Sequence, residues 1–295
     1  MSKKRIFALG FFDGVHLGHQ ALLRQCTDLA RKMGCEAAAI TFDRHPKSLV
    51  LREPPVLIST CADRHWLLAQ YGMAYVRQFP VIPEVTGMPW REFLRELLRD
   101  GAAGFVCGDD FRFGWKGEGN ALRLQEFCAE ENLPCIIVPE QLIGGIRISS
   151  TYIRRQIEEG HMDTAVDFLG HPYVLSGRIV RDRQALFPDV FTAKLRFPEG
   201  LVVPRFGVYA CRVLMDGVWH GAVTNIAHRI PPAGEGVTVE PWILTDAGSL
   251  QGREITLEFH KFLRPEETFE DSALLRETLL RDAAATRELI QTSFT

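Results

Sequence analysis

In the first half of the chain, short apolar runs alternate with segments whose apolar residues recur at three- and four-residue steps. The runs have the length of strands buried on both faces, and the spaced segments have the period of amphipathic helices. This alternation predicts an α/β fold, Rossmann-like, in which a parallel sheet carries helices on both faces. We expect strands at residues 6–9, 37–42, 74–79, 104–107 and 135–138, and helices at about 21–33, 62–71, 90–98 and 120–131.

After residue 170 the pattern changes to closely spaced short apolar runs separated by turn residues. Such runs predict a small antiparallel β-barrel, followed here by a terminal helix at about 272–291. Because residues 171–177 have the composition of a linker, we expect two domains, 1–170 and 171–295. The expected strands are 178–180, 191–197, 207–214, 221–226, 237–244 and 254–262, and the helix is expected to turn Leu274, Leu275, Thr278, Leu279, Ala283 and Ile290 toward the barrel.

Charge and cysteine content narrow the class of protein. The 295 residues carry 34 Lys plus Arg against 37 Asp plus Glu, a net charge of −3, and no basic block, so nucleic acid is not expected as a partner. Neither a signal peptide nor an apolar run of membrane-spanning length is present, which predicts a cytoplasmic protein without membrane contact. Seven cysteines without a Cys-x-x-Cys pair indicate reduced core thiols.

The stretch at residues 10–20, GFFDGVHLGHQ, lies between the first strand and the first helix. Its glycines, Gly10 and Gly18 among them, let the backbone approach a ligand, and the N-terminus of the following helix favours a phosphate. His16 and His19 can donate hydrogen bonds to phosphate oxygens. The alternative is a tight turn with two surface histidines, but the position between strand and helix favours a nucleotide site.

Two further segments follow predicted strands. His45 and Pro46 come after the second strand, where the imidazole would lie at the same sheet edge as the other two histidines, or would form an ordinary turn. In GDDFRFG, residues 108–114, the rings of Phe111 and Phe113 could stack on a flat ligand while one of the acidic residues forms a hydrogen bond with it. The alternative for this second segment is a loop with a hydrophobic plug.

A third segment, ISSTYIR at residues 148–154, has the pattern of a capped helix start. A hydroxyl cap leaves amide groups free to bind a phosphate, and Arg154 follows one turn later, where its guanidinium can bind phosphate oxygens. The alternative is an ordinary N-cap with a solvated arginine.

Together, GFFDGVHLGHQALL, TFDRHP, GDDFRFG and ISSTYIRRQI resemble, in this order and spacing, the adenylyltransferase module of the bacterial bifunctional riboflavin kinase and FAD synthetase family. The resemblance covers residues 1–170. Phe11 occupies a position that the family often fills with Asn, and Tyr152 one that it often fills with Arg. The resemblance implies transfer of AMP from ATP to FMN, giving FAD and pyrophosphate, with Mg²⁺ bridging the phosphates.

The resemblance also assigns roles to residues. His16, His19 and Arg154 would be catalytic, acting on the phosphates. ATP would contact Gly10, Phe11, Gly18, Ser150 and Thr151, and the flavin or nucleotide pocket would include His45, Pro46, Asp110, Phe111 and Phe113. No metal ligand is assigned. The partners would then be ATP, FMN and, if a second module is active, riboflavin, and the sequence leaves the oligomeric state open.

The second half resembles the riboflavin kinase module of the same family through FTAKL, GVYACRV, GAVTNIAHR and TVEPWIL. That module has a glycine-rich stretch leading into Pro-Thr-Ala-Asn, whereas residues 178–194 here contain no glycine. Thr192 is retained, Lys194 stands at the Asn position, and Glu240 matches the family's catalytic base. A cation cannot serve as an oxygen ligand of magnesium, so we expect weak or absent kinase activity.

Three functions therefore compete. The first is an FAD synthetase with a weak or inactive kinase module, the second a complete bifunctional enzyme, and the third a non-catalytic flavin-binding or regulatory protein. Retention of both histidines and of Arg154 argues against the third. Transfer to another substrate, such as pantetheine phosphate, is disfavoured because those enzymes lack the barrel.

Overall fold

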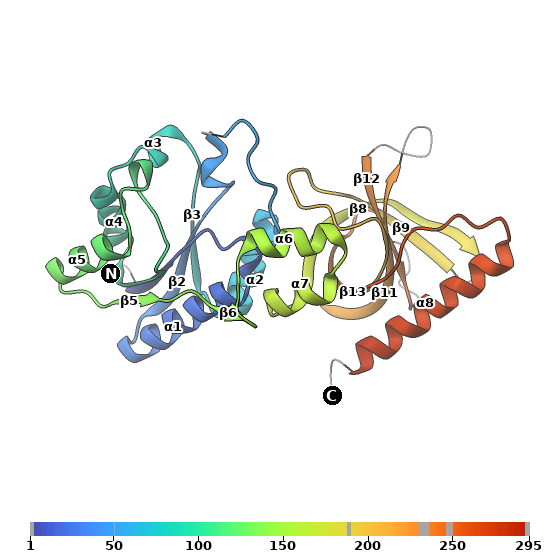
Figure 1. Ribbon diagram of the computed structural model, residues 1–295. Helices are drawn as coiled ribbons and strands as arrows, with labels where there is room; N and C mark the ends of the chain where they lie inside the picture. The colour runs from blue at the N-terminus through green and yellow to red at the C-terminus, as the bar shows by residue number, and fades with distance from the viewer. Residues whose placement is uncertain (1–2, 50, 188–189, 230–235, 246–249, 293–295) are drawn as a thin grey trace. The chain divides into compact units, whose positions relative to one another are not determined.

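The computed structural model describes residues 3–49, 51–187, 190–229, 236–245 and 250–292. The chain divides into two compact units, one formed by Met1–Leu57 with Cys61–Ser150 and the other by Ile58–Thr60 with Thr151–Thr295 (Figure 1). The predicted domains, 1–170 and 171–295, are defined by function and not by compactness, so their boundary at residue 170 stays a prediction.

The first unit is built on a five-stranded parallel sheet with the strand order β3-β2-β1-β4-β5. All five strands expected from the sequence are present, so the predicted α/β class is confirmed. The order reverses between β1 and β4, and ligands of such sheets bind outside the carboxyl ends of the strands at this switch point. The strands are β1 (Arg5–Leu9), β2 (Glu36–Phe42), β3 (Tyr75–Phe79), β4 (Ala102–Gly108) and β5 (Cys135–Val138).

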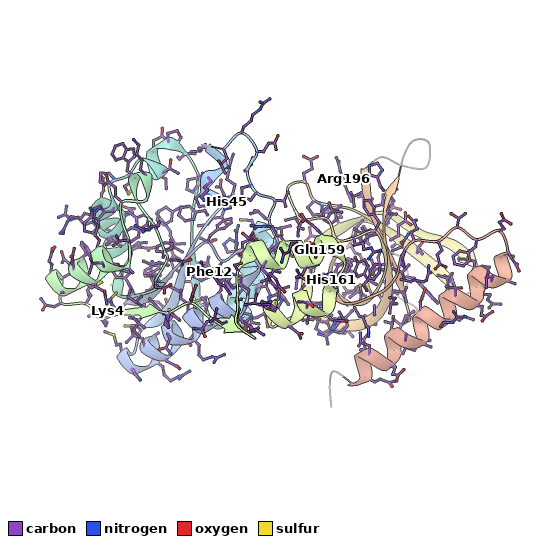
Figure 2. The ribbon with its side chains drawn as sticks, viewed as in Figure 1. Lys4, Phe12, His45, Glu159, His161 and Arg196 are labelled. Carbon is purple, nitrogen blue, oxygen red and sulfur yellow. The ribbon has the colours of Figure 1, made fainter. Side chains whose placement is uncertain are left out.

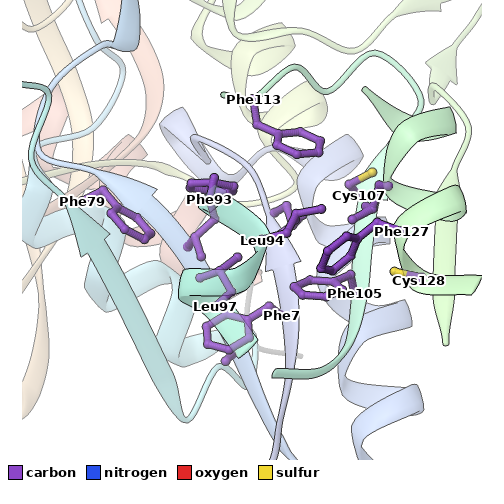
Figure 3. Close-up of a cluster of buried hydrophobic side chains, with 14 residues drawn as sticks. Phe7, Phe79, Phe93, Leu94, Leu97, Phe105, Cys107, Phe113, Phe127 and Cys128 are labelled. Atoms are coloured by element: carbon purple, nitrogen blue, oxygen red, sulfur yellow. The ribbon is translucent and has the colours of Figure 1, made fainter. Parts of the chain in front are cut away.

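Helices cover both faces of this sheet because β1 is apolar on both sides. Phe7 points into a core formed with α4 and α5, where Phe93, Leu97 and Phe127 are buried (Figure 3). On the other face, Cys26 of α1 donates a hydrogen bond from its thiol to a β1 carbonyl at 3.1 Å. The elements of this unit outside the sheet are η1 (Asp13–Val15), α1 (Leu17–Met33), η2 (Pro46–Leu49), α2 (Cys61–Gln70), α3 (Pro83–Thr86), α4 (Trp90–Arg99), η3 (Trp115–Gly117), α5 (Ala121–Glu130), β6 (Leu142–Ile143) and β7 (Ile146–Arg147).

The second unit contains a closed barrel with the strand order β10-β11-β12-β9-β8-β13, which confirms the predicted antiparallel barrel. The prediction of a linker at residues 171–177 was wrong. Tyr173 and Leu175 are buried and pair with Phe259 and Leu257, so this segment already belongs to the first barrel strand. The strands are β8 (Tyr173–Phe187), β9 (Val190–Arg196), β10 (Gly207–Met215), β11 (Val218–Arg229), β12 (Gly236–Ile243) and β13 (Glu254–Arg264).

Three helices accompany the barrel: α6 (Ser150–Glu159), α7 (Met162–Leu169) and the terminal α8 (Ser272–Thr292). Thr278 and Ala283 of α8 are buried, as the sequence predicted. Leu274 is 50% exposed, contrary to the prediction, because the covered part of α8 begins after its first turn. The buried face also includes Asp282, whose carboxylate accepts hydrogen bonds from Arg264 of β13 at 2.9 and 3.0 Å.

Candidate active site

The loop that follows β1 is strained. Phe12 and Val15 have φ angles of 60° and 42°, and Gly14 between them has a φ of 75°. Positive φ is tolerated by glycine but costs a bulky or β-branched residue roughly 1–3 kcal/mol. Both side chains are fully buried, and Figure 2 labels Phe12 within the first unit. Strain of this kind persists only where the surroundings hold the backbone firmly.

Side chains from three separate segments hold this backbone through its carbonyl oxygens. The contacts are the Thr41 hydroxyl to the Phe11 carbonyl at 2.8 Å, the Ser150 hydroxyl to the Asp13 carbonyl at 3.1 Å, and the Gln20 amide to the Val15 carbonyl at 2.9 Å. Thr41 and Gln20 are buried. The loop is therefore fixed before any ligand binds, as a site for a developing charge requires.

The two predicted histidines lie together at the start of α1. Their rings stack with centroids 3.6 Å apart and an interplanar angle of 13°. His16 is the N-cap of α1, and its Nδ1 accepts a hydrogen bond from the amide of His19 at 3.3 Å. An accepting Nδ1 carries no proton, so a neutral His16 has its proton on Nε2, where it can be donated.

His19 is kept neutral by its surroundings. Burial, the neighbouring His16 and the Arg64 guanidinium hold the pKa of His19 well below its usual range. Nδ1 of His19 is buried and has no hydrogen-bond partner among the described residues. A buried polar atom left unpaired costs free energy, and such atoms in native structures commonly mark ligand sites. A neutral imidazole at a helix N-terminus can donate to an anion.

The predicted glycines make room for rings. A Cβ at Gly10 would lie 2.8 Å from the ring of Phe12, and one at Gly18 would lie 3.3 Å from the ring of His16. Both glycines therefore allow the close packing of the loop and of the histidine pair. Their direct contact with ATP stays a prediction.

His45 reaches the same sheet edge. Its ring meets the ring of Phe11 edge to face, with centroids 5.4 Å apart, and Figure 2 labels it in the first unit. Its Nδ1 accepts a hydrogen bond from the amide of Lys47 at 3.1 Å, which fixes the turn that contains Pro46. The structure thus brings His45 beside the loop of residues 10–16, and the bond to the amide of Lys47 also makes it part of a turn, so both alternatives from the sequence are present.

The segment after β4 separates into a buried and an exposed part. Phe113 is 5% exposed and packs against Phe93 in the core, which is the hydrophobic plug that the sequence left as the alternative. Phe111 stacks on Phe113 with centroids 5.6 Å apart and is partly exposed. Asp110 is exposed and forms an ion pair with Arg147. Ligand contact by this segment stays a prediction, carried best by Phe111.

Arg154 and Thr151 lie one turn apart on α6, in the second unit. The guanidinium of Arg154 donates to the hydroxyl of Thr151 at 3.1 Å, so the two polar groups expected to bind phosphate are adjacent. Ser150 belongs to the first unit, where its hydroxyl donates a hydrogen bond to the carbonyl of Asp13 in the loop.

The kinase-like residues lie on two neighbouring barrel strands. Thr192 and Lys194 are two residues apart on β9 and therefore share one face of the barrel. Trp242 of β12 pairs with Thr192 in an antiparallel register. In that register, the residue two before Trp242, Glu240, lies across from the residue two after Thr192, Lys194. The stretch expected to lack room for phosphate is described only in part: residues 188–189 and the side chains of residues 181–186 and 191 lie outside the described residues.

Sequence reasoning missed Thr41, Gln20 and Arg64. Each is a buried polar residue that bonds a backbone carbonyl of the sheet edge or its loop. For Thr41 a signal existed, because a polar residue interrupts the otherwise apolar second strand. Arg64 and Gln20 sit in helical patterns, where an isolated polar residue is typical of a solvated face.

Comparison with known proteins matches both units. A family profile described as FAD synthetase matches residues 1–152, and one described as riboflavin kinase matches residues 169–290. Bifunctional riboflavin kinase/FMN adenylyltransferase from Listeria monocytogenes is 31% identical over 291 residues, covering 96% of this chain and 91% of its own length. The chain belongs to this family. The Escherichia coli member is also 31% identical, over 96% of this chain and 92% of its own length, and the Bacillus subtilis member is 28% identical.

A solved structure supports the fold of the whole family member. A Streptococcus pneumoniae protein described as a macrolide-efflux protein superposes with a TM-score of 0.82 at 24% identity, covering 97% of this chain and 95% of that one. None of the helices in the described part of the chain has the length and apolar character needed to cross a bilayer. Within the same residues, no group of three or more His, Cys, Asp or Glu side chains is arranged around a common metal position.

Proposed function

We propose that the first module transfers AMP from ATP to FMN, giving FAD and pyrophosphate. The observation that carries the proposal is the stacked pair of His16 and His19 at the N-terminus of α1, where Nδ1 of His19 has no hydrogen-bond partner within the described part of the chain. The pair follows β1, next to the point where the strand order reverses. A negatively charged phosphate chain would receive donors from neutral imidazoles and from the helix N-terminus at one place.

In this reaction an oxygen of the FMN phosphate attacks the α-phosphorus of ATP. The bond from that phosphorus to the oxygen that bridges to the β-phosphorus breaks, and pyrophosphate leaves with the bonding electrons. The attacking oxygen is already an anion, so the protein needs to align the reactants and to stabilise charge on the leaving group. The rigid loop would align the reactants, and His16 and His19 would stabilise the charge on the departing pyrophosphate.

Thr151 and Arg154 would hold phosphate oxygens through their side chains, and Ser150 would do so through its backbone amide, because its hydroxyl proton is donated to the Asp13 carbonyl. His45, Pro46 and Phe111 would border the pocket. Adjacent hydroxyl and guanidinium groups on Thr151 and Arg154 suit a phosphate, because a planar fork grips two oxygens. Magnesium usually binds through one or two carboxylates together with substrate phosphates, and we propose that it enters bound to ATP. Bound there, the ion would neutralise charge on the departing pyrophosphate.

For the second module we propose weak or absent riboflavin phosphorylation. Lys194 shares a face of β9 with Thr192, and the strand register sets it across from Glu240. Side chains opposite each other in an antiparallel pair lie about 4.5–5.5 Å apart at Cβ. An ammonium group at this point would repel the metal that an ATP-dependent kinase needs, and it would attract the carboxylate expected to act as base.

A paired assay tests both parts. With ATP and magnesium, FMN should be converted to FAD with one pyrophosphate released per turnover, while riboflavin should yield little or no FMN. Failure to form FAD from FMN would refute the first part. Steady formation of FMN from riboflavin, abolished by Glu240→Gln, would refute the second and leave a complete bifunctional enzyme, a function that the 96% coverage by bifunctional relatives favours as the second candidate.

A further inference from the structure

A fully buried arginine lies beneath the proposed nucleotide site. Arg64, on α2, is 0% exposed, and its guanidinium donates to the carbonyl of Phe42 at 2.9 Å and to that of Phe11 at a longer 3.5 Å. These carbonyls belong to the end of β2 and to the segment that follows β1. One side chain thus ties together two neighbouring strand ends at the carboxyl edge of the sheet.

The same guanidinium also lies over an aromatic ring. Its central carbon is 4.4 Å from the centroid of the Phe11 ring, and that ring in turn meets the ring of His45 at 5.4 Å. Arg64, Phe11 and His45 therefore form a contact chain. His45 follows β2, whereas Phe11 follows β1, so the chain fixes the relative position of two loops that border the site.

Burial of a charge is expensive. The hydrogen-bond acceptors described for Arg64 are neutral carbonyls and the Cys61 sulfur, and its Nε has no hydrogen-bond partner among the described residues. Desolvation of a guanidinium costs several kcal/mol, which neutral acceptors offset only in part. A fixed positive charge is useful, however, in a site that must receive a polyanion.

We propose that Arg64 is a positioning residue for the proposed adenylyl transfer: it holds His45 through the ring of Phe11, and from its bond to the Phe11 carbonyl it places a positive charge beside the loop that leads into His16 and His19. The inference rests on the proposed function for its reaction, but its geometry is independent of it. Arg64 acts through the loop and through its field, without contact to the substrates.

The state of His19 supports the second half of this proposal. Two charged or titratable groups act on its ring, His16 beside it and Arg64 from α2, while the ring of Phe12 contacts it edge to face at 5.2 Å. After burial and His16, Arg64 is the third cause that lowers the pKa of His19. The positive guanidinium therefore adds to the causes that disfavour the charged form of His19.

A double-mutant cycle tests the contact chain. Arg64→Lys keeps the charge but loses the planar fork, and Phe11→Leu removes the ring between the guanidinium and His45. Because misplacement by about 1 Å costs up to ~100-fold in rate, we expect each single variant to lower kcat/KM for FAD formation by about 10- to 100-fold. The double variant should be no slower than the slower single variant. If the loss in kcat/KM of the double variant equals the product of the two single losses, Arg64 and Phe11 act independently, and the proposed contact chain is refuted.

Arg5→Lys is a matched control. Arg5, at the amino end of β1, bonds the carbonyl of Asp100 at 2.7 Å and lies 3.9 Å from the ring centroid of Tyr75. It thus makes a carbonyl and a ring contact at the opposite end of the sheet, although it also pairs with the carboxylates of Asp100 and Glu36. The Arg5→Lys variant should lose less than about threefold in kcat/KM. A loss as large as that of Arg64→Lys would mean that any arginine supporting the sheet has this effect.

NMR titration of His19 provides a readout independent of turnover. In Arg64→Gln the pKa of His19 should rise, and in Arg64→Lys it should stay near that of the wild type. Should Arg64→Gln fail to fold, the double-mutant cycle of Arg64→Lys and Phe11→Leu still tests the contact chain. A wild type that makes no FAD refutes the proposed function, whereas an unmoved His19 in folded Arg64→Gln refutes the role of the Arg64 charge.

Discussion

Replacement of His19 by alanine should remove most adenylyl transfer while leaving the fold intact. The structure separates the two effects. His19 lies in the first turn of α1, and its ring contacts are the stacked ring of His16 and the edge of Phe12. Its Nδ1 has no hydrogen-bond partner among the described residues, so truncation at this position breaks no hydrogen bond of that atom.

The expected loss in rate follows from one missing donor to the leaving group. Removal of a single donor of this kind costs about 100- to 1,000-fold in kcat, or roughly 2.7–4 kcal/mol. Loss of ring contacts at a partly buried position should lower the free energy of unfolding by about 1 kcal/mol, the centre of the range for point variants. A large loss in kcat together with a small loss in the free energy of unfolding would show that His19 acts on the reaction and not on the fold.

The assay measures FAD formation from FMN and ATP under single-turnover conditions, together with thermal unfolding. His65→Ala is the control, since His65 lies on α2 and its Nδ1 contacts the carbonyl of Cys61 at 2.8 Å. This control should keep its rate within about threefold. Wild-type turnover in a folded His19→Ala variant would exclude this histidine from the mechanism.

Three further predictions concern other parts of the chain. Arg154→Lys should lower kcat/KM for ATP by at least ~10-fold, because a point charge cannot reproduce a planar fork on phosphate; wild-type kinetics would make the arginine structural. Glu240→Gln should leave FAD formation from FMN unchanged, and a loss in this assay would contradict separate modules. Glu258→Gln should destabilise the barrel by about 3–5 kcal/mol, since it removes the charged carboxylate that accepts two hydrogen bonds from buried Arg212. Burial tends to raise the pKa of Glu258, but its contact with His260 and its bonds to Arg212 outweigh burial and lower that pKa. The stabilisation from these groups is therefore present above the ordinary pKa near 4.5 and is lost as the pH falls through the lower pKa of the folded state. The difference in melting temperature between wild type and Glu258→Gln should accordingly narrow in acid.

The parallel sheet could be predicted because its information is local. Each strand is a short apolar run, and the loop after β1 combines glycines and histidines at one strand–helix junction. The carboxyl ends of parallel strands meet at one edge, so the sequence offered this edge as one of two places for His45, beside an ordinary turn; its contact with the ring of Phe11 came only from the structure.

Features that depend on long-range packing could not be predicted. Arg64 has the sequence pattern of a solvated helix residue, and only the approach of two strand ends makes it buried. The segment at residues 171–177 resembles a linker because His171, Pro172 and Gly177 are turn residues. Its apolar middle nevertheless pairs with β13, since a closed barrel needs this edge covered.

The strained backbone at Val15 has a consequence for directed evolution of thermostability. Exchange to glycine would relieve a φ of 42°, worth about 1–3 kcal/mol, but would empty a fully buried site whose side chain contributes about 1.5–3 kcal/mol. The two terms nearly cancel, so Val15→Gly should bring little gain in melting temperature while freeing the backbone that leads into His16. Libraries selected for heat resistance alone should therefore leave this position unchanged, and those that alter it should trade catalytic rate for no compensating stability.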